Sequence, residues 1–434
     1  MLKTLVHTAS VHLDAARLAL LLGARGRQPG PPDRHLALLS WYLPPHTNAG
    51  TFRPTSWLRH SPASGWRVTA VGSPVPAAEQ HIGAELRQQV RPPNRLIEFT
   101  PSRRAPSWRL TPEVDGGFVN AVDMAQTLVQ ALHHGPPEAI VATGPPFCTF
   151  VAGFMAARHW RCPLVLDYRD EWSECPFDFV SKGRSDRAWE VKCLRAAALV
   201  IYTTKSMLQH AVVRFPEVDL AKKAVVIPNG TEVDDFKPQQ TKPGASTNNR
   251  WLLVHVGALA GHTPPTELLQ VLTDGLNQAI VPLNHLALTF VGRRTREADA
   301  AIASAGCRNS ISLIDQVSKS DAIQHMQSAD ALLLIADEQL ARYMPSKLFD
   351  YVAARRPVLV FGHDGEAAQV VRDLGVGVRC NPADGPAGLA RALQALGEIE
   401  LDLGDEAVQA WLAAHRRDVL AGRLFDTLDS VLPR

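Results

Sequence analysis

The chain has 434 residues, of which 46% are hydrophobic and 20% charged, with a formal net charge of +2 at pH 7. This length allows two hydrophobic cores, and the 29 glycines and 32 prolines show no repeat, which excludes collagen-like and low-complexity chains. The near-neutral balance argues against a nucleic-acid partner, because such proteins normally carry a basic domain. We therefore expect a globular chain of two domains.

The charge is distributed unevenly along the chain. Residues 1–112 contain 14 Lys and Arg against 5 Asp and Glu, a net charge of +9, whereas the remainder has 31 against 38. A basic segment of this kind fits a solvated surface, and it equally fits a face that meets anionic lipid headgroups or an anionic substrate. Both interpretations stay open.

The six cysteines do not form a disulfide or metal-binding pattern. None belongs to a C-x-x-C pair, and no histidine cluster has the spacing of zinc ligands. The apolar run Leu18–Ala24 is too short to span a membrane, and no credible signal peptide is present. These features favour a cytoplasmic protein without a metal site.

From His35 onward, short buried strands alternate with helical patterns, and residues 1–34 are interpreted as an N-terminal extension. In the first half, strands are expected at His35–Trp41, Trp66–Val71, Asn94–Phe99, Ala139–Thr143, Leu164–Asp167, Leu199–Thr203 and Ala224–Ile227. Helices are expected near Thr55–His60 and over Val119–His133 and Phe147–Trp160.

The polar segment 237–249 reads as an interdomain linker, after which a second series of strands and helices begins. Strands are expected there at Trp251–Val256, Leu286–Val291, Ser310–Leu313, Ala331–Ile335, Pro357–Phe361 and Gly377–Arg379, with a helical tail from about Asp405 to Leu432. Two such series predict an α/β fold with two doubly wound parallel sheets. Ligands bind such sheets at the carboxyl ends of the strands, so we expect the active site in a cleft between the halves.

The segment 343–359 contains a candidate anion site. Pro345 followed by Ser346 is a typical helix start, with Ser346 as the N-cap, and Lys347 and Asp350 share the open face of the helix. A helix N-terminus with a lysine suits a diphosphate, and a carboxylate one turn further can accept both hydroxyls of a ribose. An ordinary amphipathic helix with a solvated Lys–Asp pair is the alternative.

This segment resembles the donor-binding helix of GT-B glycosyltransferases of the retaining family 4 (group 1), whose usual pattern is P-G/S-K-L-x-E-Y-x-A-x-G-x-P-V. Three further segments resemble the same family: Trp41–Arg53 its first strand and glycine loop, Leu164–Trp172 its D-x-R-D-x-W segment, and Val226–Phe236 its P-N-G-V-D-x-x-x-F run. The resemblance covers roughly residues 35–430.

The resemblance implies the GT-B fold, in which two Rossmann-like domains face a central cleft. Residues 35–236 would form the N-terminal acceptor domain, and residues 250–414 the C-terminal domain that binds the nucleotide-sugar donor. The C-terminal helix, about residues 415–434, would pack back on the first domain.

By the same resemblance, Lys347 would meet the donor diphosphate and Asp350 the ribose, with Ser346 at the start of their helix. The family normally has glutamate where this chain has Asp350, which is shorter by one methylene. It also often has a second glutamate eight residues earlier, contacting the sugar, where this chain has Arg342.

The second half opens with a candidate phosphate turn at Gly257, where the missing side chain lets a backbone N–H approach an anion. The cation that the family commonly places after this turn is replaced by His262. Arg293 and Arg294 follow a strand and either could supply the missing charge, and of the two we expect Arg293 to contact the donor. Val317 lies where the family holds the nucleobase.

In the first half, Gly50 and Thr51 form the loop that the resemblance places against the phosphates or the acceptor. Asp167, Arg169 and Asp170 lie at the carboxyl end of a strand, and are candidates for acid–base catalysis or for orienting the acceptor hydroxyl. A structural ion-pair network is the alternative for these three residues.

The resemblance thus implies transfer of a sugar from a nucleotide-diphosphate sugar to a hydroxyl of a carbohydrate, lipid-linked or other acceptor, without cofactor or metal. Bacterial polysaccharide, glycolipid or glycoconjugate synthesis is the expected setting, in the cytoplasm, with association at the inner face of the membrane also considered. A UDP-sugar 2-epimerase and a non-catalytic nucleotide-sugar binder remain alternatives. A nicotinamide dehydrogenase is disfavoured because no G-x-G-x-x-G follows a strand.

Overall fold

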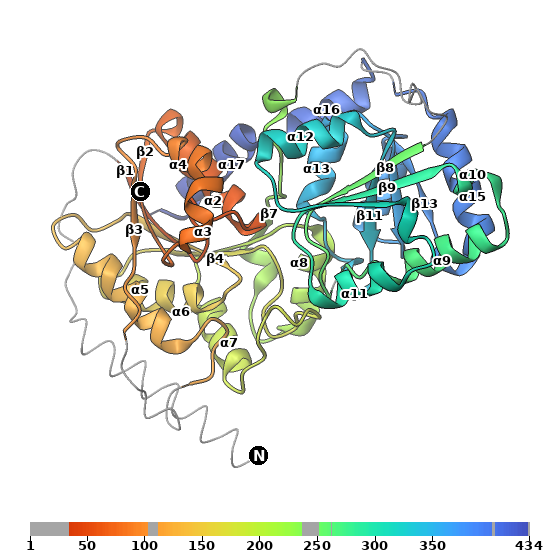
Figure 1. Ribbon diagram of the computed structural model, residues 1–434. Helices are drawn as coiled ribbons and strands as arrows, with labels where there is room; N and C mark the ends of the chain where they lie inside the picture. Colours follow the sequence, from red (N-terminus) through yellow and green to blue (C-terminus); the bar gives the residue numbers. More distant parts are fainter. Residues whose placement is uncertain (1–33, 103–111, 237–250, 262, 402–403, 433–434) are drawn as a thin grey trace. The chain divides into compact units, whose positions relative to one another are not determined.

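The computed structural model describes residues 34–102, 112–236, 251–261, 263–401 and 404–432 (Figure 1). The chain divides into two compact units, one running to Pro228 and resuming at Asp418, the other spanning Asn229–Arg417. Each unit is a parallel β-sheet with helices on its faces, so the predicted α/β fold of two Rossmann-like domains is confirmed. The proposed extension, apart from Arg34, and the proposed linker 237–249 lie outside the described residues.

The sheet of the N-terminal unit has the strand order β3-β2-β1-β4-β5-β6-β7. Its strands are β1 (Arg34–Ser40), β2 (Trp66–Gly72), β3 (Arg95–Glu98), β4 (Ala139–Gly144), β5 (Leu164–Tyr168), β6 (Leu199–Tyr202) and β7 (Ala224–Val226). The order reverses between β1 and β4, and ligands of such sheets bind where it reverses, at the carboxyl ends of the strands.

Alternate side chains of the N-terminal sheet point to opposite faces and bury against different helices. On one face, Leu38 lies in a core with Trp57 of α2 (Phe52–His60) and Phe425 of α17 (Arg417–Val431). On the other, Gly153 of α6 (Cys148–Trp160) lies so close that a Cβ there would be 3.0 Å from the Cβ of Ala142. Beside α6 lies α5 (Phe118–Ala131), as Figure 1 shows. The remaining helices of this unit are α3 (Ala77–Ile82), α4 (Ala84–Gln88), α7 (Asp186–Ala196) and α8 (Lys205–Arg214).

The sheet of the second unit repeats this topology, in the order β10-β9-β8-β11-β12-β13. Its strands are β8 (Trp251–Val256), β9 (Leu286–Val291), β10 (Ile311–Ile314), β11 (Ala331–Ala336), β12 (Val358–Gly362) and β13 (Gly377–Cys380). Its switch point therefore lies between β8 and β11.

Helices cover both faces of the second sheet. Neighbouring strand residues point to opposite faces, and Leu253 and Val254 accordingly belong to different hydrophobic clusters. The helices are α9 (Thr266–Asn277), α10 (Val281–Asn284), α11 (Arg296–Ser304), α12 (Lys319–Ser328), α13 (Ser346–Ala353), α14 (Glu366–Asp373), α15 (Gly385–Glu398) and α16 (Glu406–Ala414). In the part of the chain that is described, no helix has the length and apolar composition required to cross a bilayer.

Three sequence expectations differ from the structure. Ser346 is the first residue of α13 rather than its N-cap, because Pro345 has extended backbone (φ −56°, ψ 130°) and takes the cap position. The expected continuous tail is divided into α16 and α17, because the intervening residue Arg416 forms a parallel β-bridge with Thr231. Phe236, expected at the end of the first domain, packs in a core of the second unit.

Candidate functional site

The predicted phosphate turn and the predicted donor lysine lie in contact at the switch point of the second sheet. Gly257 directly follows β8 and has φ +132°, a conformation that favours glycine. A Cβ at this position would lie 2.8 Å from the Nζ atom of Lys347, in the first turn of α13. The glycine therefore leaves the space that the lysine side chain occupies.

The ammonium of Lys347 lies 3.1 Å from Nε2 of His255, a buried residue of β8. The other ring nitrogen, Nδ1, is 3.0 Å from the carbonyl oxygen of Leu333, to which only an N–H can donate. Nε2 is thus unprotonated and accepts from the ammonium. Burial and the Lys347 charge lower the pKa of His255 well below its usual value, so the ring is neutral.

Lys347 carries a positive charge that no described carboxylate neutralises. Its side chain is partly buried, and burial lowers its pKa from 10.5 to about 8. No carboxylate in the described ranges forms an ion pair with it. An ammonium without a counter-ion among the described residues, beside a glycine turn and a helix N-terminus, favours an anionic ligand.

Asp350 lies one turn after Lys347 on the partly exposed side of α13, whose buried residues include Leu348 and Phe349. The hydroxyl of Thr231, a fully buried residue, donates to Oδ1 of Asp350 at 2.5 Å. No other hydrogen bond to this carboxylate is formed by the described residues, so Oδ2 accepts no hydrogen bond from them.

The two arginines that follow β9 differ in their surroundings. Arg294 donates to the carboxylates of Asp299 (2.8 Å) and Asp315 (2.6 Å), and to the carbonyl of Gly292 (2.9 Å). Arg293 is exposed and its Nε donates to the side chain of Gln316. The geometry therefore supports Arg293 over Arg294 as a ligand-facing cation.

The remaining predicted donor positions have other contacts or are not described. Val317 is partly buried and packs against a core of the second unit. The guanidinium of Arg342 lies 5.9 Å from the ring centroid of Tyr343. His262 lies outside the described residues.

In the N-terminal unit, Arg169 joins the loops that follow β1 and β4. Its guanidinium donates to the carbonyl oxygens of Gly50 (2.6 Å), Gly144 (3.2 Å) and Pro145. A side chain at Gly50 would displace the guanidinium, because a Cβ there would lie 2.6 Å from Nη1 of Arg169. Two residues singled out from the sequence thus contact each other, and Arg169 holds the switch-point loops in place.

The neighbouring loop residue Thr51 is also held by local contacts. Its backbone N–H donates to the carbonyl of Asn48 at 2.9 Å, and the Asn48 side chain accepts from the N–H of Gly50. The Thr51 hydroxyl is buried and has no hydrogen-bond partner among the described residues.

Asp167 belongs to a buried ion pair. Both of its oxygens accept from Arg53, at 2.7–3.1 Å, and the Thr143 hydroxyl donates to Oδ2 at 2.6 Å. Its exposed fraction is 0%. The geometry supports the structural ion-pair interpretation for Asp167, with a partner, Arg53, that the sequence analysis did not identify.

Asp170 has different surroundings. It is partly exposed, and none of the described residues forms a hydrogen bond or ion pair with it. Burial raises the pKa of Asp170 from 3.8 to about 6, an effect that the nearby Arg169 partly opposes and Glu171 reinforces. Of the three residues predicted to be catalytic, Asp170 is therefore the one whose carboxylate accepts no hydrogen bond from the described residues.

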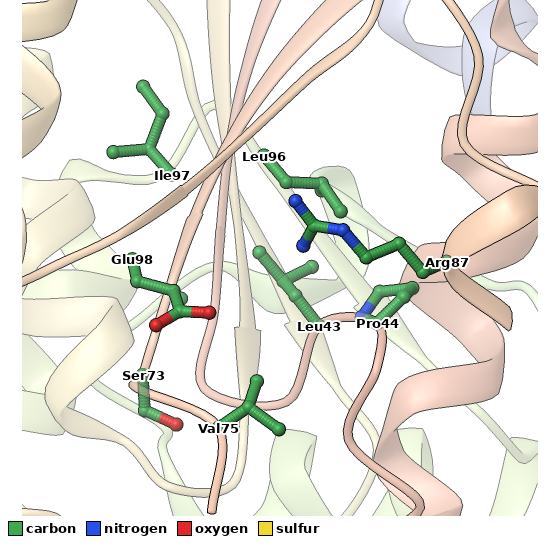
Figure 2. A pocket seen from close by; sticks show the side chains of 9 residues that line it. Leu43, Pro44, Ser73, Val75, Arg87, Leu96, Ile97 and Glu98 are labelled. Atoms are coloured by element: carbon green, nitrogen blue, oxygen red, sulfur yellow. The ribbon is translucent and has the colours of Figure 1, made fainter. Parts of the chain in front are cut away.

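Two further features at this edge were missed by sequence reasoning. Glu171 is buried, and its Oε1 lies 2.5 Å from Nδ1 of His210 on α8. The two residues are 39 positions apart, and no sequence motif links them. A cavity of about 230 Å³ lies where β1, β2 and β3 end. Figure 2 shows its apolar lining from Leu43 and Leu96, together with the charged side chains of Arg87 and Glu98.

Within the ranges that the structure describes, no three His, Cys, Asp or Glu side chains lie close enough together to hold a metal ion.

Comparison with known proteins identifies the fold. Residues 48–230 match the family model described as "Glycosyl transferase 4-like domain". Sucrose-phosphate synthase from Thermosynechococcus elongatus has a similar structure at 13% identity, with a TM-score of 0.61 over 92% of this chain and 95% of that chain. No curated protein matches the sequence of this chain.

Two further solved structures are similar. HepE from Anabaena, in complex with UDP and glucose, is 16% identical, with a TM-score of 0.60 over 92% of this chain and 97% of that chain. The lipopolysaccharide outer core galactosyltransferase WaaB, in its apo form, is 12% identical, with a TM-score of 0.59 over 91% of this chain and 99% of that chain.

The chain has the fold of GT-B glycosyltransferases, with two Rossmann-like units. Over residues 48–230 it matches a glycosyl transferase 4-like domain, in agreement with the resemblance of the sequence motifs to family 4 (group 1).

Proposed function

We propose that this chain is a glycosyltransferase, which moves a sugar from a nucleotide-diphosphate sugar to a hydroxyl of a carbohydrate, lipid-linked or other acceptor. The observation that carries the proposal is the ammonium of Lys347, which lies against Gly257 at a sheet switch point and has no carboxylate partner among the described residues. A diphosphate would supply the negative charge and the hydrogen-bond acceptors that the ammonium of Lys347 does not find among the described carboxylates.

The donor half of the reaction follows from these groups. When the bond to the sugar breaks, negative charge develops on the diphosphate, and Lys347 with the N–H groups of the first turn of α13 stabilises it. These fixed positive groups are the reason to propose transfer without a metal. Asp350 would accept hydroxyl hydrogen bonds from the ribose, while retention at the anomeric carbon rests on the family resemblance.

The acceptor half is assigned to the N-terminal unit. Asp170, with a pKa of about 6, is largely ionised near neutral pH and can accept a hydrogen bond from the acceptor hydroxyl. Arg169 positions the loops beside it through Gly50, Gly144 and Pro145. An apolar part of an acceptor would fit the cavity lined by Leu43 and Leu96 (Figure 2).

Two of the similar structures guide the choice of substrates. HepE was solved with UDP and glucose, which makes UDP the first nucleotide to test. WaaB acts in lipopolysaccharide outer core synthesis by its name, which supports the proposal of a role in bacterial polysaccharide, glycolipid or glycoconjugate synthesis.

The first experiment is calorimetry of the full chain with UDP, GDP, ADP and TDP. We expect one of them to bind, and K347M to weaken that binding. K319M is the matched control, because Lys319 also begins a helix but is paired with Asp235 at 2.5 Å. Absence of binding by all four nucleotides at millimolar concentration would refute the proposal.

The second experiment distinguishes the reaction classes. The matching nucleotide-sugar is incubated with and without an acceptor, in buffer with EDTA. We expect a glycosylated product only when an acceptor is present, with the chelator making no difference. Conversion of the donor alone to an epimer would instead identify an epimerase.

We also propose that the basic N-terminal region associates with anionic membranes, on the basis of its net charge of +9 over residues 1–112. Part of this region, 1–33 and 103–111, lies outside the described residues. Sedimentation with phosphatidylglycerol vesicles at low salt tests this, and a protein that stays in the supernatant would contradict it.

A further inference from the structure

We propose that Thr231 is a positioning residue that fixes the carboxylate of Asp350 for the two hydroxyls of a nucleotide ribose. This inference rests on the proposed donor-binding function of α13. Its basis is the 2.5 Å hydrogen bond in which the Thr231 hydroxyl donates to Oδ1 of Asp350, across a sequence separation of 119 residues. The bond restrains the carboxylate and directs its second oxygen to the ligand.

Thr231 can act in this way because its own backbone is held on both sides. Its N–H donates to the carbonyl of His415 at 3.1 Å, and its carbonyl accepts from the N–H of Arg417 at 3.2 Å. The Arg417 side chain also donates to the carbonyl of Gly230 at 3.0 Å. The hydroxyl is therefore presented from a fixed backbone, and Thr231 has an exposed fraction of 0%.

The helix that carries Asp350 is attached to the same segment. Phe349 stacks on Trp411 of α16, with ring centroids 5.3 Å apart and an interplanar angle of 15°. Phe349 also contacts the ring of His415, at 5.2 Å. Both ends of the Thr231–Asp350 bond are thus anchored to residues 411–417, so neither partner can shift without breaking other contacts.

The two partners are also two departures from the motifs that the sequence resembles. The P-N-G-V-D run has valine at the position of Thr231, and the helix motif has glutamate at the position of Asp350. Valine cannot donate a hydrogen bond, whereas aspartate is one methylene shorter than glutamate. The Thr231 hydroxyl thus lies beside the carboxylate of Asp350, which extends less far from the helix than a glutamate would. By fixing the orientation of this carboxylate, the hydrogen bond compensates for its shorter side chain.

The test uses T231V, which keeps the side-chain shape and removes only the hydroxyl, with T231S as the matched control. Calorimetry measures the binding of UDP, ADP and GDP and of their 2′-deoxy counterparts to the full chain. We expect wild-type protein and T231S to favour the ribonucleotide. In T231V this preference should fall about tenfold, because a hydrogen bond to a charged group is lost.

A double-mutant cycle gives a second readout. In the D350E background we expect the longer side chain to reach the ribose without the hydrogen bond from Thr231. T231V should therefore change ribonucleotide affinity by less than about twofold in that background. An unchanged ribose preference in T231V, with D350N abolishing that preference, would refute the role of Thr231 and leave the donor site standing. Absence of nucleotide binding by wild-type protein would instead refute the donor site itself.

Discussion

The Nζ atom of Lys347 and the Nε2 atom of His255 form a 3.1 Å hydrogen bond in which a neutral imidazole accepts from an ammonium. The imidazole orients the lysine but cannot cancel its charge, as a carboxylate would. The site therefore keeps a partly buried positive charge in the absence of ligand, a cost to stability that an incoming anion would relieve.

We expect K347M to weaken nucleoside-diphosphate binding by about tenfold to a hundredfold, since hydrogen bonds to charged groups contribute about 1.5–3 kcal/mol. The same variant should be more stable than wild type without ligand, because methionine removes the partly buried charge and keeps the side-chain volume. Calorimetry and thermal denaturation measure the two effects. A loss of both binding and stability would mean that Lys347 is structural.

Nucleotide binding should weaken as the pH rises through about 8, where Lys347 loses its proton. The unliganded protein should show the opposite trend between about pH 8 and 10.5. There the unfolded lysine is still protonated while the folded one is not, so the unfolded state binds more protons and stability rises with pH. The contribution of Lys347 appears as the difference between wild type and K347M in both measurements, and identical pH profiles would contradict it.

G257A should reduce nucleotide affinity to a similar extent as K347M. Alanine is strained at φ +132°, and its Cβ would displace the lysine by approaching Nζ within 2.8 Å. G261A is the matched control, since a Cβ at Gly261 meets nothing within 4 Å. Equal affinities for the two variants would show that the Gly257–Lys347 contact has no part in binding.

D170N and D167N should have opposite effects on activity and stability. We expect D170N to lower kcat by about a hundredfold with little change in Tm, because Asp170 is partly exposed and has no partner among the described residues. D167N should lower stability by about 3–5 kcal/mol, because it leaves the buried charge of Arg53 without its counter-ion.

The pH profile gives an independent check on Asp170. If its ionised form accepts the acceptor hydroxyl, kcat should rise with pH through about 6, the raised pKa of this carboxyl. In D170N the rise of kcat with pH should disappear, whereas in D170E, which keeps a carboxylate, kcat should still rise with pH. A wild-type rate that is flat between pH 5 and 7 would exclude the role.

The sequence was sufficient to predict every strand that the structure contains within one residue of its bounds. The strand bounds could be predicted because each buried strand is a short apolar run between turn residues, and such a run is visible within a few residues of the sequence. Lys347 and Gly257 could likewise be singled out from the sequence, since helix start, charge and glycine turn are each visible over a few residues, but their contact was not predicted.

The partners of the site residues were not predictable from local pattern. Lys347 contacts a histidine 92 residues earlier, in a strand that reads as apolar, and Asp167 pairs with an arginine 114 residues earlier. Periodicity indicates which face of an element is buried, but it does not indicate which side chain lies opposite. The choice between Asp167 and Asp170 therefore needed the three-dimensional contacts.

The packing of α17 bears on how the protein is made. The second unit is one continuous stretch, Asn229–Arg417, whereas the core of the N-terminal unit includes Leu424, Phe425 and Leu428 of the last helix. During synthesis the second unit has its full sequence available before the first does, although the first emerges earlier. The N-terminal unit can therefore close its core only after Leu428 has been synthesised, and thus after the whole sequence of the second unit.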